Sequence, residues 1–308
     1  MKRGSLITVA AVIATIGLGD VEAQTQRPTF RAGVDLVRVA AVVRDHKGHF
    51  VQDLSAKDFE VLEGGKTRPI TDFRRDLSSV SVAVLFDVSG SMEGHLPFAR
   101  EAAAHVLSWL ETQDEAAVFT FDTSLHEVTT FTEGLRALPQ SLSTVVPFGA
   151  TSLHDAIAQT ATRAGAREGR RRGVVVLTDG NDNASRMTPS QVSAVASEID
   201  VPVYVFGIVP SIDNPSADTA TMSIERSAFA GPLTDLANLT GGHLFVASTP
   251  GQRSIAARQI VDELRHQYLI AFESSGIPGW HPLVVRARQK DLVVRARSGY
   301  MAGQTRPS

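Results

Sequence analysis

The chain has 308 residues, no cysteine and a formal net charge of −3. Its hydrophobic content of 43% and charged content of 20% are ordinary globular values, so a disordered chain is not expected and the length suits about two domains. The near-neutral charge gives no reason to expect nucleic acid or an anionic membrane as partner, and the lack of cysteine excludes disulfides, thiolate zinc sites and cysteine nucleophiles.

The first segment, residues 1–23, has the pattern of an export signal. Lys2 and Arg3 precede an apolar run from Leu6 to Leu18, and small residues at Val21 and Ala23 mark a cleavage site before Gln24. The apolar run is shorter than the roughly 20 residues that a spanning helix needs, so cleavage is favoured over a membrane anchor. We therefore predict an exported protein, periplasmic or secreted, with no membrane span after cleavage.

Residues 24–79 are predicted to be rich in β-strands. Apolar side chains alternate from Val37 to Val43, which is the period of a half-buried strand. A turn is expected at residues 45–48, and a second strand from Phe59 to Leu62 is closed by Gly64 and Gly65.

Residues 80–266 alternate between strand and helix patterns. Apolar runs predict strands at 80–86, 116–121, 174–177 and 203–208, and helical spacing predicts helices at 97–110, 153–164, 188–199, 233–239 and 254–265. This alternation predicts an α/β fold with a doubly wound, mostly parallel sheet. The polar stretch 209–231 has two interpretations: it shapes ligand choice, or it is a floppy insertion.

Residues 267–308 return to a β pattern. We expect a strand from Tyr268 to Phe272 and a hairpin formed by residues 283–288 and 292–297. The two β segments are predicted to pair into one small β domain into which the α/β domain is inserted. The alternative, two separate appendages, is disfavoured because each would have too few strands to be stable alone.

Two groups of arginines stand out in the sequence. Four of them share one face of the expected hairpin: Arg286, Arg288, Arg295 and Arg297. A contact with an anionic polymer or lipid headgroup is one interpretation, but a solvated sheet face is favoured. The run from Arg167 to Arg172 is interpreted as a solvated turn between a helix and a strand.

Polar residues follow the first buried strand directly. Asp87, Ser89 and Ser91 alternate around Val88 and Gly90, and alternate residues of an extended loop point the same way. Ligands of a doubly wound sheet bind outside the carboxyl ends of its strands. Thr151 opens the helix at 153–164 and Asp179 follows the strand at 174–177, so both should lie on the same rim as Asp87.

These five side chains form an all-oxygen set, which favours a hard cation such as Mg²⁺, with Mn²⁺ or Ca²⁺ as alternatives. Two carboxylates neutralise a divalent ion, and the hydroxyls add no charge. If the carboxylates act through water, the ion stays electrophilic and one coordination position is free. The predicted partner is a protein that presents a Glu or Asp carboxylate.

The pattern Asp87-x-Ser89-x-Ser91, then Thr151, then Asp179 resembles the metal-ion-dependent adhesion site of von Willebrand factor A domains. The resemblance covers about residues 80–265 and implies that the serines and the threonine coordinate the metal directly, while the aspartates act mostly through water. With residues 42–64 and 294–300 added, the chain is similar to bacterial exported VWFA-related domain proteins.

Two other functions compete with a metal-dependent adhesion module. One is an envelope assembly scaffold that does not use the metal. The other is a metal-dependent hydrolase, which we disfavour because Ser89 stands where a dehalogenase-like phosphatase needs a second Asp, and because no Gly-x-Ser-x-Gly elbow is present. His154 is interpreted as an ordinary helix residue. We therefore predict a protein that is not an enzyme and has no catalytic residues.

Overall fold

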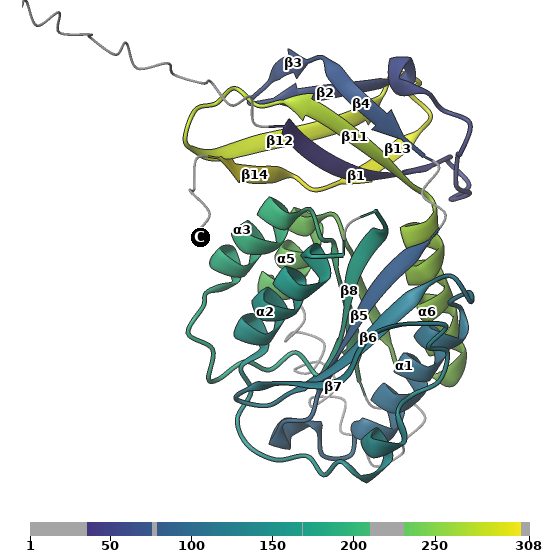
Figure 1. Cartoon of the computed structure of the whole chain (residues 1–308), viewed down its shortest axis with the longest axis vertical. Coiled ribbons are helices and arrows are strands. Elements are labelled where there is room, and N and C mark those ends of the chain that lie inside the picture. Colours follow the sequence, from purple (N-terminus) through teal and green to yellow (C-terminus); the bar gives the residue numbers. More distant parts are fainter. Residues whose placement is uncertain (1–35, 76–78, 168, 210–230, 303–308) are drawn as a thin grey trace, which may run out of the picture. The chain divides into compact units, whose positions relative to one another are not determined.

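The computed structural model describes residues 36–75, 79–167, 169–209 and 231–302 (Figure 1). The predicted export signal at 1–23 and nearly all of the 209–231 stretch lie outside these residues. No helix in the described ranges is long and apolar enough to cross a membrane.

The central part of the chain forms a six-stranded sheet in the order β10-β9-β8-β5-β6-β7. Its strands are β5 (Val80–Asp87), β6 (Glu115–Phe121), β7 (Leu125–Glu133), β8 (Arg171–Thr178), β9 (Val203–Ile208) and β10 (Leu244–Ala247). Only β7 runs antiparallel to its neighbour. All residues of β5, β6 and β9 are buried, which explains why these strands are mostly apolar.

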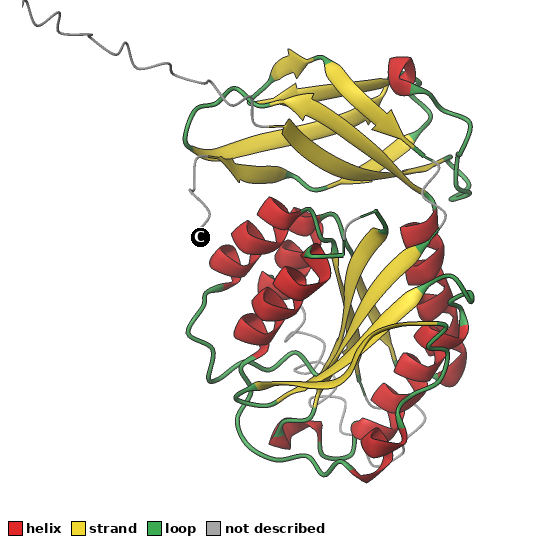
Figure 2. Ribbon diagram, in the orientation of Figure 1, coloured by secondary structure: helices red, strands yellow, loops and turns green. Residues whose placement is uncertain are grey.

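Helices cover both faces of this sheet (Figure 2). One apolar cluster packs α1 (Leu96–Ser108) and α6 (Pro250–Arg265) against the sheet. A second cluster packs α2 (Leu153–Gly165), α3 (Pro189–Ile199) and α5 (Pro232–Thr240) against the opposite face. The predicted doubly wound α/β fold is therefore confirmed.

The two flanking segments build a pair of four-stranded sheets, in the orders β13-β1-β11-β4 and β14-β12-β2-β3. The N-terminal strands are β1 (Leu36–Arg44), β2 (Phe59–Glu63), β3 (Lys66–Arg68) and β4 (Ile70–Arg74), and the C-terminal strands are β11 (Gln267–Glu273), β12 (Gly279–Ala287), β13 (Val293–Ala296) and β14 (Gly299–Ala302). The antiparallel pairs β1–β11 and β2–β12 join the segments, as expected for one small β domain made from both.

The predicted hairpin at 283–297 is wrong. β12 pairs with β2 and β14, whereas β13 pairs with β1 in the other sheet. The chain crosses between the sheets after β12, so that Leu283 and Val285 enter the shared apolar core from one sheet and Val294 and Ala296 from the other. Both strands therefore turn one face toward the core between the two sheets.

The interpretation of the arginines as solvated is also wrong for several of them. Arg286 and Arg288 are exposed, but Arg297 is buried and donates to the Arg38 carbonyl. Arg295 forms an ion pair with the buried Glu263.

In the 167–172 turn, Arg167 makes a bidentate pair with the Glu115 carboxylate, with both N–O distances at 2.7 Å, and Arg171 is buried. Glu115 is itself buried at the start of β6, and a buried carboxylate needs such a partner.

Candidate metal centre

The loop after β5 gathers three polar side chains at the end of the strand. Asp87 is the last residue of β5 and is fully buried. Its Oδ1 accepts hydrogen bonds from the Ser89 backbone N–H at 3.0 Å and from Ser89 Oγ at 2.6 Å. Ser91 is exposed, and its Oγ lies 3.1 Å from Ser89 Oγ. The two serine hydroxyls therefore share one small region at the rim of the sheet.

The loop after β8 contacts this first loop through Thr178. Its Oγ1 donates to Asp87 Oδ2 at 2.7 Å and accepts the Gly180 N–H at 3.0 Å. Asp179 follows directly and is buried, with Oδ1 accepting the Asn181 N–H at 3.1 Å. Both carboxylate oxygens of Asp87 are thus occupied by hydroxyl donors from the ends of two adjacent strands.

Thr151 is held from two sides. Its N–H donates to Asn183 Oδ1 at 2.8 Å, and its carbonyl accepts the N–H groups of Asn183 and Ala184, each at 3.0 Å. The segment before it is bound to the Asp87 loop, because the Gly90 N–H donates to the Gly149 carbonyl at 3.0 Å. A Cβ on Gly90 would lie 3.2 Å from that carbonyl oxygen, so glycine permits the close approach.

Side chains of the β8 loop also cap the start of α2. Ser152, at the N-cap position, makes no side-chain cap hydrogen bond. Instead Asp182 Oδ2 accepts the His154 N–H at 2.9 Å, and Ser185 Oγ accepts the Asp155 N–H at 3.2 Å. These bonds satisfy backbone donors that the first turn of a helix leaves free. The three loops that carry the predicted site residues are therefore joined to one another by hydrogen bonds.

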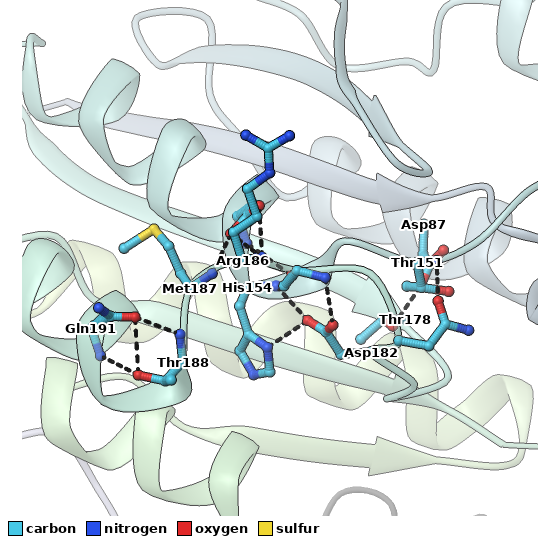
Figure 3. Close-up of polar contacts among 12 residues, drawn as sticks. Asp87, Thr151, His154, Thr178, Asp182, Arg186, Met187, Thr188 and Gln191 are labelled. Atoms are coloured by element: carbon cyan, nitrogen blue, oxygen red, sulfur yellow. Dashed lines mark hydrogen bonds and ion pairs between the residues drawn. The ribbon is translucent and has the colours of Figure 1, made fainter.

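His154 has a specific partner in this network. Its Nδ1 lies 2.5 Å from Asp182 Oδ2, and Figure 3 shows the ring directed toward that carboxylate. Its Nε2 is buried and has no hydrogen-bond partner among the described residues. The roles of Thr178, Asp182 and Asn183 were not predicted from the sequence. The only signal for them was the run of Asn and Asp residues after β8, a composition that is typical of side chain to backbone hydrogen bonds.

Asp87 is a buried acidic group whose hydrogen-bond donors among the described residues are two hydroxyls and a backbone N–H, with no basic side chain. Burial raises the pKa of Asp87 and the nearby Asp179 charge adds to this, while the hydrogen bonds from Ser89 and Thr178 lower it, so that the net pKa is about 6. In the described ranges, no cluster of three or more His, Cys, Asp or Glu side chains could hold a metal ion. The centre combines carboxylates with hydroxyls instead.

The oxygen geometry fits a small octahedral cation. Neighbouring ligands of Mg²⁺, each about 2.1 Å from the ion, lie about 3 Å apart, which is close to the separation of Ser89 Oγ and Ser91 Oγ. Because Ser89 donates its hydroxyl hydrogen to Asp87, its oxygen lone pairs are available on the other side.

Residues 81–252 match the family model of the von Willebrand factor type A domain. The chain belongs to this family. Its von Willebrand factor A domain is accordingly a module of the protein-interaction and adhesion type. A comparison with curated proteins gave no match.

Several solved structures are similar to this von Willebrand factor A protein. An aerotolerance-related membrane protein from Bacteroides fragilis shares 18% identity, covering 60% of this chain and 98% of its own, with a TM-score of 0.48. BatB from Bacteroides thetaiotaomicron shares 16% identity over the same fractions, with a TM-score of 0.45. A von Willebrand factor type A protein from Catenulispora acidiphila shares 13%, covering 87% of this chain and 72% of its own, with a TM-score of 0.44.

Proposed function

We propose that this protein is an exported, non-enzymatic binding module that holds one Mg²⁺ ion and uses it to bind an acidic side chain of a protein partner. The observation that carries the proposal is the 3.1 Å separation of the Ser89 and Ser91 hydroxyl oxygens, beside a buried carboxylate that accepts a hydrogen bond from Ser89. Mn²⁺ and Ca²⁺ are alternative ions. When bound, the ion would supply an electrophilic position for a carboxylate from outside the protein.

The five predicted residues have distinct roles in this proposal. Ser89, Ser91 and Thr151 would bind the ion through their hydroxyl oxygens. Asp87 and Asp179 would act through water, which agrees with the two hydroxyl donors that already occupy both oxygens of Asp87. An ion held mainly by neutral oxygens keeps more of its positive charge for the partner than an ion held directly by carboxylates.

The side chains of the centre support a role in binding. The Ser89 hydroxyl donates to a carboxylate, and the nearest histidine in sequence to Thr151, His154, is bonded to Asp182. A nucleophilic serine needs a general base at its hydroxyl hydrogen. The acceptor of the Ser89 hydrogen bond is Asp87, whose carboxylate is buried and also accepts a hydrogen bond from Thr178. We therefore interpret Asp87 as a group that orients the serine and not as a general base.

The proposal includes the domain organisation. Residues 1–23 would be removed as an export signal, residues 24–79 and 267–308 would form the β domain, and residues 80–266 would form the von Willebrand factor A domain. The pairing of β1 with β11 and of β2 with β12 supports an insertion of the α/β domain between the two β segments.

Calorimetric titration of the metal-free protein with Mg²⁺ tests the metal centre. We expect one ion per chain in the wild type, and at least a tenfold weaker affinity in Ser89→Ala and Asp179→Asn, since each removes a ligand or its charge. Two matched controls should bind as the wild type does: Ser143→Ala, at an exposed residue of the short 3-10 helix after β7, and Asp291→Asn, at an exposed carboxylate before β13. Absence of binding for Mg²⁺, Mn²⁺ and Ca²⁺ in the wild type would refute the proposal.

Partner binding separates the adhesion module from a scaffold that does not use the metal. A partner isolated with the wild type in Mg²⁺ should be released by EDTA and should not be retained by Ser89→Ala. Equal retention of the partner by the wild type in Mg²⁺, by the wild type in EDTA and by Ser89→Ala would favour the scaffold.

A further inference from the structure

The two most exposed large apolar side chains in the described residues lie two positions apart in the chain, five and three positions before Thr151. Val146 is 78% exposed and Phe148 is 80% exposed, whereas the next most exposed, Val293, is 64% exposed. Single exposed apolar residues are common on protein surfaces, but two within three positions, in a segment that leads into the candidate metal centre, form a local apolar surface.

The backbone of this segment is fixed at both ends. Arg100 of α1 donates through Nε to the Leu142 carbonyl at 2.9 Å and through Nη2 to the Val145 carbonyl at 3.0 Å. At the second residue of the exposed pair, the Phe148 N–H donates to the Val88 carbonyl at 3.0 Å. Val88 stands between the proposed ligand Ser89 and the buried Asp87. The two apolar side chains are therefore exposed to solvent on a loop whose backbone is fixed by hydrogen bonds.

This position limits how far the apolar pair can be from the proposed ion. Phe148 precedes Thr151 by three residues, and three extended residues span at most about 10 Å. Its backbone nitrogen is also bonded directly to the loop that carries Ser89 and Ser91. In an extended ligand, residues two positions apart point the same way and lie about 7 Å apart, so one short segment could reach both features.

We infer that Val146 and Phe148 form an apolar subsite beside the metal centre, and that the partner segment carries a bulky aliphatic or aromatic side chain within about three residues of its acidic residue. This rests on the proposed function, because the acidic residue would be bound by the ion. The carboxylate would fix the segment at Ser89, Ser91 and Thr151, and the apolar side chain would cover Phe148. Neighbouring apolar contact of this kind excludes water from the polar contact at its edge.

A display library of random linear peptides, selected on the whole protein in Mg²⁺ and eluted with EDTA, tests the subsite. From the wild type we expect enriched peptides with Asp or Glu and, within three positions, a Phe, Trp, Leu or Ile. Individual synthetic peptides from this pool should bind the double variant Val146→Ser/Phe148→Ser at least about tenfold more weakly than they bind the wild type. The Mg²⁺ affinity of the double variant, measured without peptide, should equal that of the wild type.

The matched control removes two exposed apolar side chains elsewhere. Ile277 is 63% exposed and Val293 is 64% exposed, both in the β domain, so Ile277→Ser/Val293→Ser should bind the peptides as the wild type does. If the enriched peptides carry an acid with no apolar preference, and the Val146→Ser/Phe148→Ser variant binds them normally, the subsite is refuted and the metal function stands. If the wild type yields no peptide that EDTA elutes, both the subsite and the carboxylate-binding function are refuted.

Discussion

Thr178 donates its hydroxyl hydrogen to Asp87 Oδ2 at 2.7 Å, and so joins the carboxyl ends of the neighbouring parallel strands β8 and β5. Because Ser89 occupies the other oxygen of the same carboxylate, the orientation of Asp87 is fixed from both sides. This bond orients an acidic group that we place one water molecule away from the ion. Residues that orient such groups commonly contribute tenfold or more to metal affinity.

Thr178→Val keeps the shape of the side chain and removes the hydroxyl. We expect the free energy of unfolding to fall by about 2 kcal/mol, since a hydrogen bond to a charged acceptor is lost, and Mg²⁺ affinity to fall by about tenfold or more. Urea denaturation and calorimetry measure the two effects.

Thr160→Val is a matched control for this change. Thr160 is fully buried in α2, and its Oγ1 has no hydrogen-bond partner among the described residues. Removing that hydroxyl should leave stability equal or higher and Mg²⁺ affinity unchanged. Equal Mg²⁺ affinities for Thr178→Val and Thr160→Val would show that the bond to Asp87 does not orient the centre.

The raised pKa of Asp87 predicts a pH dependence of metal-free stability. Burial raises this pKa from its ordinary 3.8 to about 6 in the folded protein. The contribution of this carboxyl group to the free energy of unfolding is therefore fully present below pH 3.8. It is lost as the pH rises through 6, and the total loss is up to about 3 kcal/mol. The Asp87→Asn variant has no carboxyl group at this position and so does not show this change. In EDTA, its free energy of unfolding relative to that of the wild type should therefore increase between acid and neutral pH. A constant difference in the free energy of unfolding across that range would contradict the assignment.

The same titration predicts a pH dependence of metal binding. A divalent ion favours the ionised carboxylate, so the ion and the proton compete at Asp87. The Mg²⁺ affinity of the wild type should fall as the pH drops below about 6, as measured by calorimetry. The thermal shift that Mg²⁺ produces should therefore be larger near pH 7.5 than near pH 5.

The sequence predicted the buried strands of the sheet better than its edges. The strand at 203–208 was predicted with the bounds that β9 has, because every residue of a strand between two layers of helices is buried and apolar. β7 and β10 were missed. β7 is exposed along much of its length, and β10 has only four residues, so neither shows a continuous apolar run.

Pairing between distant segments was harder to predict than the strands themselves. Residues 284–288 and 293–297 share the sequence Val-Val-Arg-Ala-Arg, which indicates strands but not their partners, because the period of a strand is the same whichever sheet it joins. Likewise, the ends of β5 and β8 could be placed at one rim from topology, which brought Asp87 and Asp179 together as candidates. The bond from Thr151 to Asn183 depends on side-chain directions in two loops, which no local pattern encodes.

Glu63 lies at the centre of a buried polar cluster in the β domain. It pairs with Arg68, whose Nη2 lies 2.5 Å from Oε2, and with His281 Nδ1 at 3.2 Å from Oε1, and it accepts the Tyr300 hydroxyl. Although burial acts to raise its pKa, the hydrogen bonds from Tyr300, Ser275 and Arg68 lower the pKa overall.

Glu63→Ala should reduce the free energy of unfolding by on the order of 3 kcal/mol, because it leaves the partners of a buried carboxylate without an acceptor. Glu60→Ala is a control on the same strand, where the carboxylate pairs with the exposed Arg286 and little change is expected. Urea denaturation at neutral pH measures both. A similar small effect for the two variants would show that the cluster around Glu63 is not a net source of stability.

Gly242 lies where the chain leaves α5 and passes the start of β9. A Cβ at this position would lie 2.0 Å from the Val203 carbonyl oxygen and 2.5 Å from its carbonyl carbon. These are backbone atoms of a central strand, which is also held by Thr240 Oγ1 accepting the Val203 N–H at 3.0 Å. Gly242→Ala should therefore lower the free energy of unfolding by about 3 kcal/mol or more, measured by urea denaturation.

Gly251→Ala makes the same substitution where the space is open. Gly251 lies in the first turn of α6, and a Cβ there would meet no atom within 4 Å. Because alanine favours the helix over glycine, this variant should be as stable as the wild type or more stable, by up to about 1 kcal/mol. Gly242→Ala should thus lower the urea midpoint, whereas Gly251→Ala should leave it unchanged or raise it. A Gly242→Ala protein as stable as Gly251→Ala would mean that α5 and β9 do not approach as closely as the structure shows.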